Sequence, residues 1–302
     1  MNMAVDFLGI HMKNPVIAAS GTFGFGLEYK DYMDLNQIGA ISLKGLASTP
    51  WEGNAGVRVA ETPAGMLNCI GLENPGVDYF KAHYLPELRE YDVPLIANIV
   101  GRTEEEYGQV AEALTVPGIS AFEMNISCPN VKKGSLAFGT NPDMAADVTR
   151  IVKENTDLPV MVKLSPNVTD VVSIAKAVEE AGADSISLIN TLLGIAIDLR
   201  TRRPVLGNIT GGLSGPAVKP VALRMVWQVA SAVNIPVCGL GGIMTGKDAA
   251  EFMVAGASTI QVGTATIASP DAIPRITREL ETWCEQNGVE NVSDLTGTMK
   301  IN

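Results

Sequence analysis

The sequence predicts an α/β fold, a single (β/α)8 TIM barrel with an N-terminal hairpin, and three observations lead to it. Short apolar runs alternate with longer segments of helical periodicity along the chain. The runs are continuously apolar, which is typical of parallel strands covered on both faces. From Pro15 onward there are eight of them, each followed by a helical pattern, and eight units suggest a closed ring. We therefore expect one domain spanning residues 1–302.

The first half of the chain is expected to supply the hairpin, at residues 5–12, and four barrel strands. An irregular excursion over residues 47–77 follows the second strand, and so long a connection in a compact domain is usually functional. Within it, residues 58–61 and 64–68 can pair as a small hairpin. The strands are predicted at 15–19, 38–43, 94–100 and 119–127. Helices are predicted at 27–35, at 79–91 and from Thr103 on. In the last of these, Glu104–Glu106 suit the positive end of the helix dipole.

The second half of the chain is expected to complete the ring. The loop after the fourth strand, residues 130–141, is polar and carries Gly134 and Gly139 as hinge candidates. Another long loop, residues 192–216, follows the sixth strand, so insertions are expected after strands two, four and six. Strands are predicted at 159–164, 184–189, 235–240 and 258–262, and helices at 141–155, 169–181, 218–233, 245–255 and 270–286.

An open, doubly wound sheet is the alternative architecture. Such sheets that bind dinucleotides carry a Gly-x-Gly-x-x-Gly fingerprint in the first strand–helix turn. The glycine-rich stretch Gly21–Gly26 stands there, but its spacing is wrong and no ribose-binding acid follows. The closed barrel is therefore favoured.

The overall composition narrows the classes of partner. Hydrophobic residues make up 46% and charged residues 18% of the chain, as in a globular protein with a large core. The net charge of −11 repels nucleic acid and anionic membranes, so neither is an expected partner. No signal-peptide pattern and no apolar stretch of about 20 residues occurs, which predicts a location in the cytoplasm.

Cysteine is weighed more heavily than histidine as a source of chemistry. His11 and His83 are the only histidines, so we do not expect acid–base catalysis by histidine. The four cysteines lie far apart and form no CxxC pair, which predicts reduced thiols and argues against an internal zinc or iron–sulfur site. We expect no metal on this chain.

Polar or glycine residues stand at the carboxyl end of every predicted barrel strand, where barrels of this class keep their active sites. Buried amides and ammonium groups cost free energy unless they have partners, so their gathering at one mouth indicates a binding site. They are Ser20, Lys44, Asn98, Asn125 with Cys128, Lys163, Asn190 with Thr191, Gly241 with Gly242, and Gly263 with Thr264.

Three of these features point to particular chemistry. Cys128 precedes Pro129, which cannot extend a ladder, so a thiol is presented where a strand meets a loop, as a proton acceptor or nucleophile. A small buried residue at a strand end is the plainer alternative for a lone cysteine.

The glycines after the last two strands, joined by Gly215, can wrap a phosphate with backbone N–H groups, or merely turn the chain. Lys163 lies in an otherwise apolar strand, where an unpaired charge would be costly.

Five stretches together resemble the class 1 dihydroorotate dehydrogenases, and the similarity extends from about Asn14 to Ala268. The long loop after the sixth strand, residues 191–216, is more similar to the NAD-linked class 1B catalytic subunit than to the fumarate-linked class 1A enzyme. The motif Ser-Cys-Pro-Asn alone also occurs in the related barrel of dihydropyrimidine dehydrogenase. The five stretches are residues 68–76 (Asn-Cys-Ile-Gly-Leu-Glu-Asn-Pro-Gly), 125–130 (Asn-Ile-Ser-Cys-Pro-Asn), 162–167 (Val-Lys-Leu-Ser-Pro-Asn), 189–191 (Ile-Asn-Thr) and 211–216 (Gly-Gly-Leu-Ser-Gly-Pro).

The resemblance implies FMN at the barrel mouth and oxidation of (S)-dihydroorotate to orotate in de novo pyrimidine biosynthesis. Cys128 would remove the C5 proton while the C6 hydride passes to FMN. Class 2 relatives use serine at that position, which supports class 1. The substrate would be held by Lys44, Asn68, Cys69, Ile70, Gly71, Leu72, Asn125, Asn190 and Thr191, and FMN by Ser20, Lys44, Gly45, Asn98, Asn125, Lys163, Ile189, Gly215, Gly241, Gly242, Gly263 and Thr264.

The class 1B resemblance further implies a partner subunit carrying FAD and a 2Fe–2S iron–sulfur cluster, through which electrons leave to NAD. The expected assembly is a homodimer of this chain flanked by two partner subunits, a heterotetramer. Two alternatives remain open: a fumarate-dependent homodimer of class 1A type, and a non-catalytic FMN-binding barrel.

Overall fold

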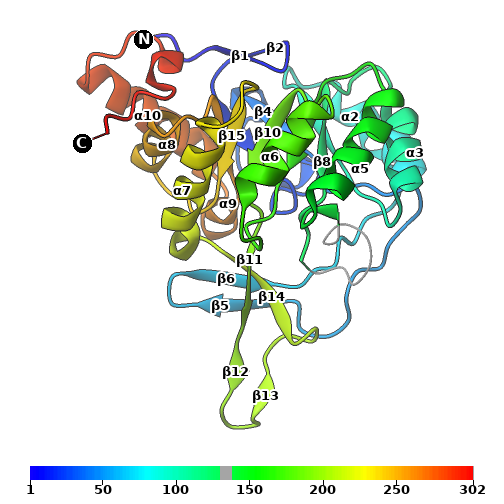
Figure 1. The fold of residues 1–302 in the computed structure, drawn as a ribbon. Helices are drawn as coiled ribbons and strands as arrows, with labels where there is room; N and C mark the ends of the chain where they lie inside the picture. Colours follow the sequence, from blue (N-terminus) through cyan, green and yellow to red (C-terminus); the bar gives the residue numbers. More distant parts are fainter. Residues whose placement is uncertain (130–137, 302) are drawn as a thin grey trace.

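Eight parallel strands close into a barrel in the computed structural model, which describes residues 1–129 and 138–301 (Figure 1). Around the ring the strands follow the order β10-β15-β16-β3-β4-β7-β8-β9, so neighbours in sequence are neighbours in space. The predicted fold class is thereby confirmed. The barrel strands are β3 (Val16–Ala18), β4 (Ala40–Ser42), β7 (Leu95–Ile99), β8 (Ala121–Asn125), β9 (Val160–Lys163), β10 (Ser185–Leu188), β15 (Val237–Leu240) and β16 (Thr259–Val262).

The strand register places polar residues of adjacent strands side by side at two successive levels. Asn98 of β7 pairs with Glu123 of β8, and Asn125 pairs with Lys163 of β9. Side chains on a strand alternate between its faces, so Glu123 and Asn125 point the same way, towards the barrel interior. The register therefore gathers these side chains near the carboxyl end of the barrel.

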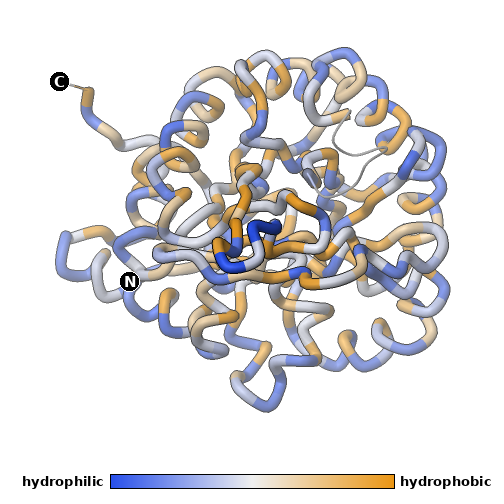
Figure 2. The backbone as a smooth tube through the Cα atoms, turned by 90° about the horizontal axis from the view of Figure 1, so that it is seen from below, coloured by the Kyte–Doolittle hydropathy of each residue, from blue (hydrophilic) through white to orange (hydrophobic). Residues whose placement is uncertain are grey.

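Helices surround the barrel, as the view from below in Figure 2 shows. Several begin at the residue that the sequence suggests, because a side chain caps the first turn: Thr103 accepts from Glu106 N, and Asn141 accepts from Asp143 N. The short α9 was not expected. The helices are α1 (Val77–His83), α2 (Leu85–Leu88), α3 (Glu104–Leu114), α5 (Pro142–Glu154), α6 (Val171–Glu180), α7 (Lys219–Ala230), α8 (Gly246–Val254), α9 (Thr264–Ala268) and α10 (Ala272–Gln286), with 3-10 turns η1 (Leu27–Tyr29), η2 (Leu35–Gln37), η3 (Pro216–Val218) and η4 (Val292–Leu295).

Two predicted helices differ in the structure. The helix expected over residues 27–35 is wrong: the chain makes only the turns η1 and η2, because Asp34 accepts a hydrogen bond from Asn36 N and so starts a separate turn. The helix expected over residues 79–91 is divided into α1 and α2. Pro86 stands in the first turn of α2, and a proline has no N–H to continue a preceding helix.

The insertions after the second and sixth strands join in one four-stranded sheet. The predicted small hairpin is confirmed as β5 (Val59–Thr62) and β6 (Gly65–Asn68). The second insertion is not a plain loop, which corrects the prediction for residues 192–216. Its strands β11 (Leu192–Ile195) and β14 (Thr210–Ser214) pair with each other, and β14 also pairs with β6, in the order β11-β14-β6-β5. Beyond them β12 (Ile197–Asp198) and β13 (Arg203–Pro204) form an arm that projects away from the barrel (Figure 1).

The insertion expected after the fourth strand falls largely on residues 130–137, which include Asn130 and Gly134 and lie outside the described residues.

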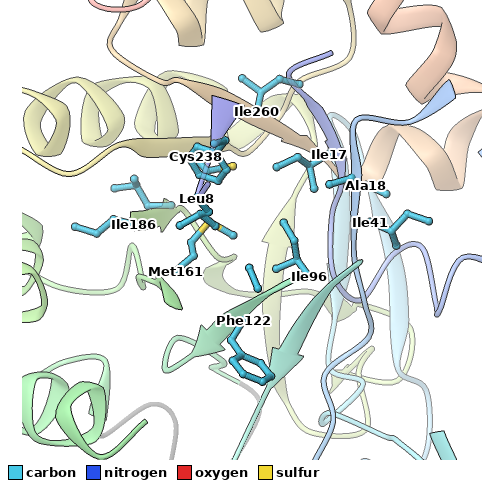
Figure 3. Packing of buried hydrophobic residues seen from close by; sticks show 14 of the residues in the cluster. Leu8, Ile17, Ala18, Ile41, Ile96, Phe122, Met161, Ile186, Cys238 and Ile260 are labelled. Carbon is cyan, nitrogen blue, oxygen red and sulfur yellow. The ribbon is translucent and has the colours of Figure 1, made fainter. Parts of the chain in front are cut away.

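The predicted N-terminal hairpin is confirmed as β1 (Val5–Phe7) and β2 (Ile10–Met12). Its turn residues Leu8 and Gly9 both have positive φ, 56° and 71°, as a two-residue hairpin turn of type I′ requires. Leu8 belongs to the main buried cluster, to which every barrel strand contributes; Figure 3 labels Leu8 and such side chains from the barrel strands. No helix among residues 1–129 and 138–301 has the length and apolar character to cross a membrane.

Candidate active site

A cavity of about 240 Å³ opens at the carboxyl ends of the barrel strands. Its floor and sides come from the strand ends, and the sheet formed by the two insertions covers one side, through Val59, Met66, Asn68 and Leu213. Residues far apart in sequence thus converge on one space.

The Glu123 carboxylate lies beneath the cavity and is completely buried. Its Oε2 accepts hydrogen bonds from Ser42 Oγ (2.7 Å) and Asn98 Nδ2 (2.7 Å). Its Oε1 accepts from Ser187 Oγ (2.8 Å) and Gln261 Nε2 (2.7 Å). Strands β4, β7, β10 and β16 are therefore tied to β8 through one side chain.

Lys163 is the charge partner of Glu123. Its Nζ lies 3.5 Å from Glu123 Oε2, and both side chains are almost fully buried, at 5% and 0% exposure. Burial alone would raise the pKa of Glu123, but the Lys163 charge and the hydrogen bonds from Ser42, Gln261 and Ser187 hold that pKa below its ordinary value. Glu123 is therefore a carboxylate, and Lys163, which lines the cavity, is held from below by an anion.

A chain of amides and hydroxyls runs beside this pair. Asn125 Nδ2 donates to Asn98 Oδ1 (3.4 Å), Ser127 Oγ donates to Asn125 Oδ1 (3.0 Å), and Asn190 Nδ2 donates to Ser127 Oγ (2.8 Å). The backbone at Asn125 is fixed by Tyr107, whose hydroxyl donates to its carbonyl (2.7 Å). Asn125 and Asn190 thus have set orientations at the cavity wall.

Cys128 reaches the same cavity from the loop that follows β8. It lines the cavity together with Pro129, and only 6% of its surface is exposed. A thiol at this place is shielded from bulk water and still able to touch a ligand.

Lys44, just after β4, supplies a second cation to the cavity wall. Burial lowers its pKa from the ordinary value of 10.5, while the nearby carboxylates of Glu73 and Glu28 oppose that shift. A partly desolvated ammonium group of this kind gains free energy when it pairs with an anionic ligand.

Three glycines also line the cavity. Gly215, Gly241 and Gly242 have positive φ values of 93°, 125° and 80°, a conformation that other residues rarely adopt. The segment after β15 is held by Asp248, whose Oδ2 accepts from Met244 N (3.0 Å) and Thr245 N (2.9 Å). Backbone N–H groups in such turns suit a phosphate.

Comparisons with known proteins decide the family. The family model described as dihydroorotate dehydrogenase matches residues 2–283. The chain belongs to the dihydroorotate dehydrogenase family. A relative from Geobacter sp. (strain M21) is 56% identical over 301 residues, covering 99% of each chain, and one from Desulforamulus reducens is 56% identical over 302 residues, covering 100% of this chain and 99% of the relative. Both are named dihydroorotate dehydrogenase B (NAD(+)), catalytic subunit.

A solved structure agrees with the fold of this family. It is a dihydroorotate dehydrogenase from Eimeria tenella in complex with ferulenol, with a TM-score of 0.85 over 98% of this chain and 88% of that one. The identity of 22% makes this a likeness of fold alone.

Most residues that the sequence singles out line this single cavity of the dihydroorotate dehydrogenase family member. Two of the predicted residues lie apart from it. Asn98 stands one layer below, between Glu123 and Asn125, and Cys69 packs beside Leu206 in a separate buried cluster. Those at the cavity are Ser20, Lys44, Gly45, Asn68, Ile70, Gly71, Leu72, Asn125, Cys128, Lys163, Ile189, Asn190, Thr191, Gly215, Gly241, Gly242, Gly263 and Thr264.

Sequence reasoning missed the layer beneath the cavity. Glu123, Ser42 and Ser187 form this layer together with Gln261, which also lines the cavity; all four are buried and polar, and sequence reasoning singles out none of them. A signal existed for Glu123, because a carboxylate between Phe122 and Met124 in a buried strand demands a cationic partner. Its partners come from other strands, so only the closed barrel identifies them.

Proposed function

We propose that this chain oxidises (S)-dihydroorotate to orotate in pyrimidine biosynthesis, with FMN as its cofactor. One observation carries the proposal: in a member of this family, a shielded thiol, two lysines and a row of oriented amides meet in a single cavity. A thiol can accept a proton, lysine can hold a carboxylate, and amides match a ring bearing both N–H and C=O groups.

The residues at the cavity fit FMN. Gly263 lines the cavity beside Ala19 and Thr22, and a Cβ on it would lie 3.5 Å from their side chains, so glycine leaves this part of the wall without a side chain of its own. Gly215, Gly241, Gly242 and Thr264 would hold the phosphate, and Lys163 would lie at the ring. When bound, FMN supplies an acceptor for a hydride.

The substrate would be held from the other side. Lys44 would pair with the carboxylate of dihydroorotate, while Asn125, Asn190 and Asn68 would bind the N–H and C=O edges of the ring. Residues 70–72 and Thr191 would close around it. These groups come from separate elements that the barrel and the insertion sheet bring together.

Cys128 would act as the base. Its Sγ would take the proton from C5, the hydrogen at C6 would leave with its electron pair, and the two changes together form the C5–C6 double bond of orotate. The low exposure of Cys128 keeps water from competing for that position.

We further propose that electrons leave to NAD through a partner subunit carrying FAD and a 2Fe–2S cluster, in a cytoplasmic heterotetramer built on a homodimer of this chain. The names of the relatives, which specify NAD(+) and a catalytic subunit, support this view. The insertion after the sixth strand supports it too, because Leu193 and Ile195 of β11, Ile197 of β12 and Leu199 just beyond it form an exposed apolar row.

The proposed activity is tested by assaying the purified, FMN-loaded chain with dihydroorotate and a dye acceptor. We expect orotate to form without any second protein. A chain that holds FMN and produces no orotate would instead be a non-catalytic flavin-binding barrel. Turnover with fumarate alone would favour the class 1A alternative, whereas turnover with NAD only after the partner is added would support the NAD-linked assembly.

A further inference from the structure

The Glu123 carboxylate accepts four hydrogen bonds and pairs with Lys163, yet it has no direct role in the proposed reaction. Its carboxylate does not line the cavity, so it would touch neither substrate nor cofactor. It is nevertheless ionised and fully buried, an arrangement that costs free energy unless its partners compensate. Such a group calls for a role that acts through its neighbours.

The partners of Glu123 lead to the cavity along three routes. Lys163, 3.5 Å away, lines the cavity itself. Gln261 donates to Oε1 and also lines the cavity. Asn98 donates to Oε2 and accepts from Asn125, which lines the cavity as well.

We propose that Glu123 is a positioning residue which, through Lys163, sets how strongly the site favours reduced over oxidised flavin. The inference rests on the FMN binding proposed above and adds to it the control of the flavin's redox balance by a buried anion. The paired charges of Glu123 and Lys163 cancel in part, so the field that Lys163 exerts at the cavity is weaker than that of a lone cation.

The charges around Glu123 and Lys163 predict whether loss of the Glu123 charge favours reduced or oxidised flavin. Reduced flavin can carry a negative charge on its ring, which a nearby lysine stabilises. Removing the negative charge of Glu123 leaves the Lys163 field uncompensated and should favour the reduced form. Cys238 packs against the pair, but burial raises the pKa of its thiol to about 12, so it adds no charge at neutral pH.

The substitution Glu123→Gln is sterically matched to the site. Its new NH2 group would face Ser187 and Gln261, both of which now donate to Oε1. A hydroxyl can rotate to accept instead, and Gln261 has an oxygen, Oε1, without a hydrogen-bond partner among the described residues. The variant can therefore keep its hydrogen bonds while losing its charge.

The test measures the ratio of FMN dissociation constants, oxidised over reduced, from the midpoint potential of the bound flavin and the affinity for oxidised FMN. We expect E123Q to raise this ratio about tenfold, equivalent to roughly 30 mV for a two-electron couple. In a Lys163→Met background the same change should alter the ratio by less than about twofold, because without the Lys163 charge burial raises the pKa of Glu123 and favours its neutral form, so that E123Q removes no charge.

Two controls keep charge and shape apart. Ser187→Ala removes one hydrogen bond to Glu123 without removing its charge, and Glu123→Asp keeps the charge on a shorter side chain. Each should leave the ratio within about twofold of the wild type. A tenfold change in either would overturn the assignment.

The remaining outcomes are equally decisive. If E123Q changes the ratio of FMN dissociation constants equally in the wild-type and Lys163→Met backgrounds, Glu123 has a merely structural role. No shift in the wild-type background would refute the assignment and leave the proposed function intact. A wild-type chain that binds no FMN would refute the proposed function itself.

Discussion

Cys128 owes its position to the residues on either side of it. The strand β8 ends at Asn125, Ser127 is anchored to the Asn125 side chain, and Pro129 cannot continue a ladder. The thiol is consequently held at the edge of the cavity by local structure. This position could be predicted from the sequence, because a proline after a buried strand fixes where the strand must end.

Replacing Cys128 by alanine tests its role as base. We expect the variant to bind FMN, since the thiol is not needed for that, and to slow flavin reduction by dihydroorotate about 10²–10⁴-fold, the usual contribution of a positioned base. The measurement is single-turnover bleaching of the flavin band. Cys284→Ala is the matched control, because that thiol is buried on α10 and does not line the cavity, and the variant should react at the wild-type rate. An unaffected rate in Cys128→Ala would assign the base to another group.

Lys44 predicts a pH dependence of substrate binding. Burial lowers its pKa from 10.5, so the ammonium form, which would pair with the substrate carboxylate, is lost at a lower pH than for an exposed lysine. The KM for dihydroorotate should therefore rise with pH on the alkaline side, beginning below 10.5. Lys44→Arg, which stays protonated, should remove that rise. Lys44→Met should raise KM about 10–100-fold at neutral pH, the value of a charge-assisted hydrogen bond. A KM that is independent of pH in the wild type would contradict the role.

The layer beneath the cavity could not be found residue by residue. Lys163 was recognised because a lysine in an apolar strand needs a partner, but the partner itself comes from β8, and the remaining donors come from β4, β7, β10 and β16. Such a network depends on the ring closing in one register, which local sequence does not specify. Asn98, which the resemblance places at the cofactor, donates to Glu123 and accepts from Asn125 in the structure, and its place there stays a prediction.

At the scale of elements, the sheet that covers the cavity is held close to Thr191 by a glycine. A Cβ on Gly212 of β14 would overlap the Thr191 hydroxyl, so any larger residue displaces that side chain. Gly212→Ala should therefore weaken dihydroorotate binding about tenfold, the value of one lost hydrogen bond, and leave FMN binding unchanged. Gly194→Ala on the neighbouring strand β11 is the control, because its Cβ would meet the flexible end of Leu67 at 3.1 Å and make an ordinary contact with Leu213 at 3.9 Å. The measurement is the KM for dihydroorotate of both variants. If the two substitutions change this KM equally, Thr191 has no role in binding the substrate.

Prediction succeeded best for elements with one dominant local cause. The barrel strands are continuous apolar runs, and α3 and α5 begin at Thr103 and Asn141, which cap them. The stretch 27–35 has apolar residues at helical spacing, yet Asp34 captures Asn36 N and starts a new turn. Residues 192–216 form strands because β6 is available to pair with β14, a long-range contact that the local sequence does not show.

The whole molecule displays a barrel with its site at one end and an arm beyond it (Figure 1). Leu193 and Ile195 of β11, Ile197 of β12 and Leu199 just beyond it alternate with less exposed residues, and Leu199 is 86% exposed. Exposed apolar rows of this kind are typical of protein contacts, and this one lies on a chain whose net charge of −11 otherwise favours solubility.

The arm predicts how the chain self-associates. If this row contributes to the proposed homodimer, the double change Ile197→Ser with Leu199→Ser should shift the sedimenting species from dimer to monomer while FMN still binds. Tyr32→Ser removes an exposed side chain elsewhere, at 64% exposure, and should leave the dimer intact. A double variant that remains dimeric would place the contact on another face.

The central claim is that this barrel mouth joins FMN, Cys128 and dihydroorotate in one reaction. It is tested most directly by titrating the FMN-loaded chain with dihydroorotate in the absence of oxygen, NAD and any second protein, following the visible flavin band and the orotate formed. We expect the band to bleach with one orotate produced per FMN. A chain that stays colourless when offered FMN, or a flavin band unchanged by dihydroorotate, would contradict the account.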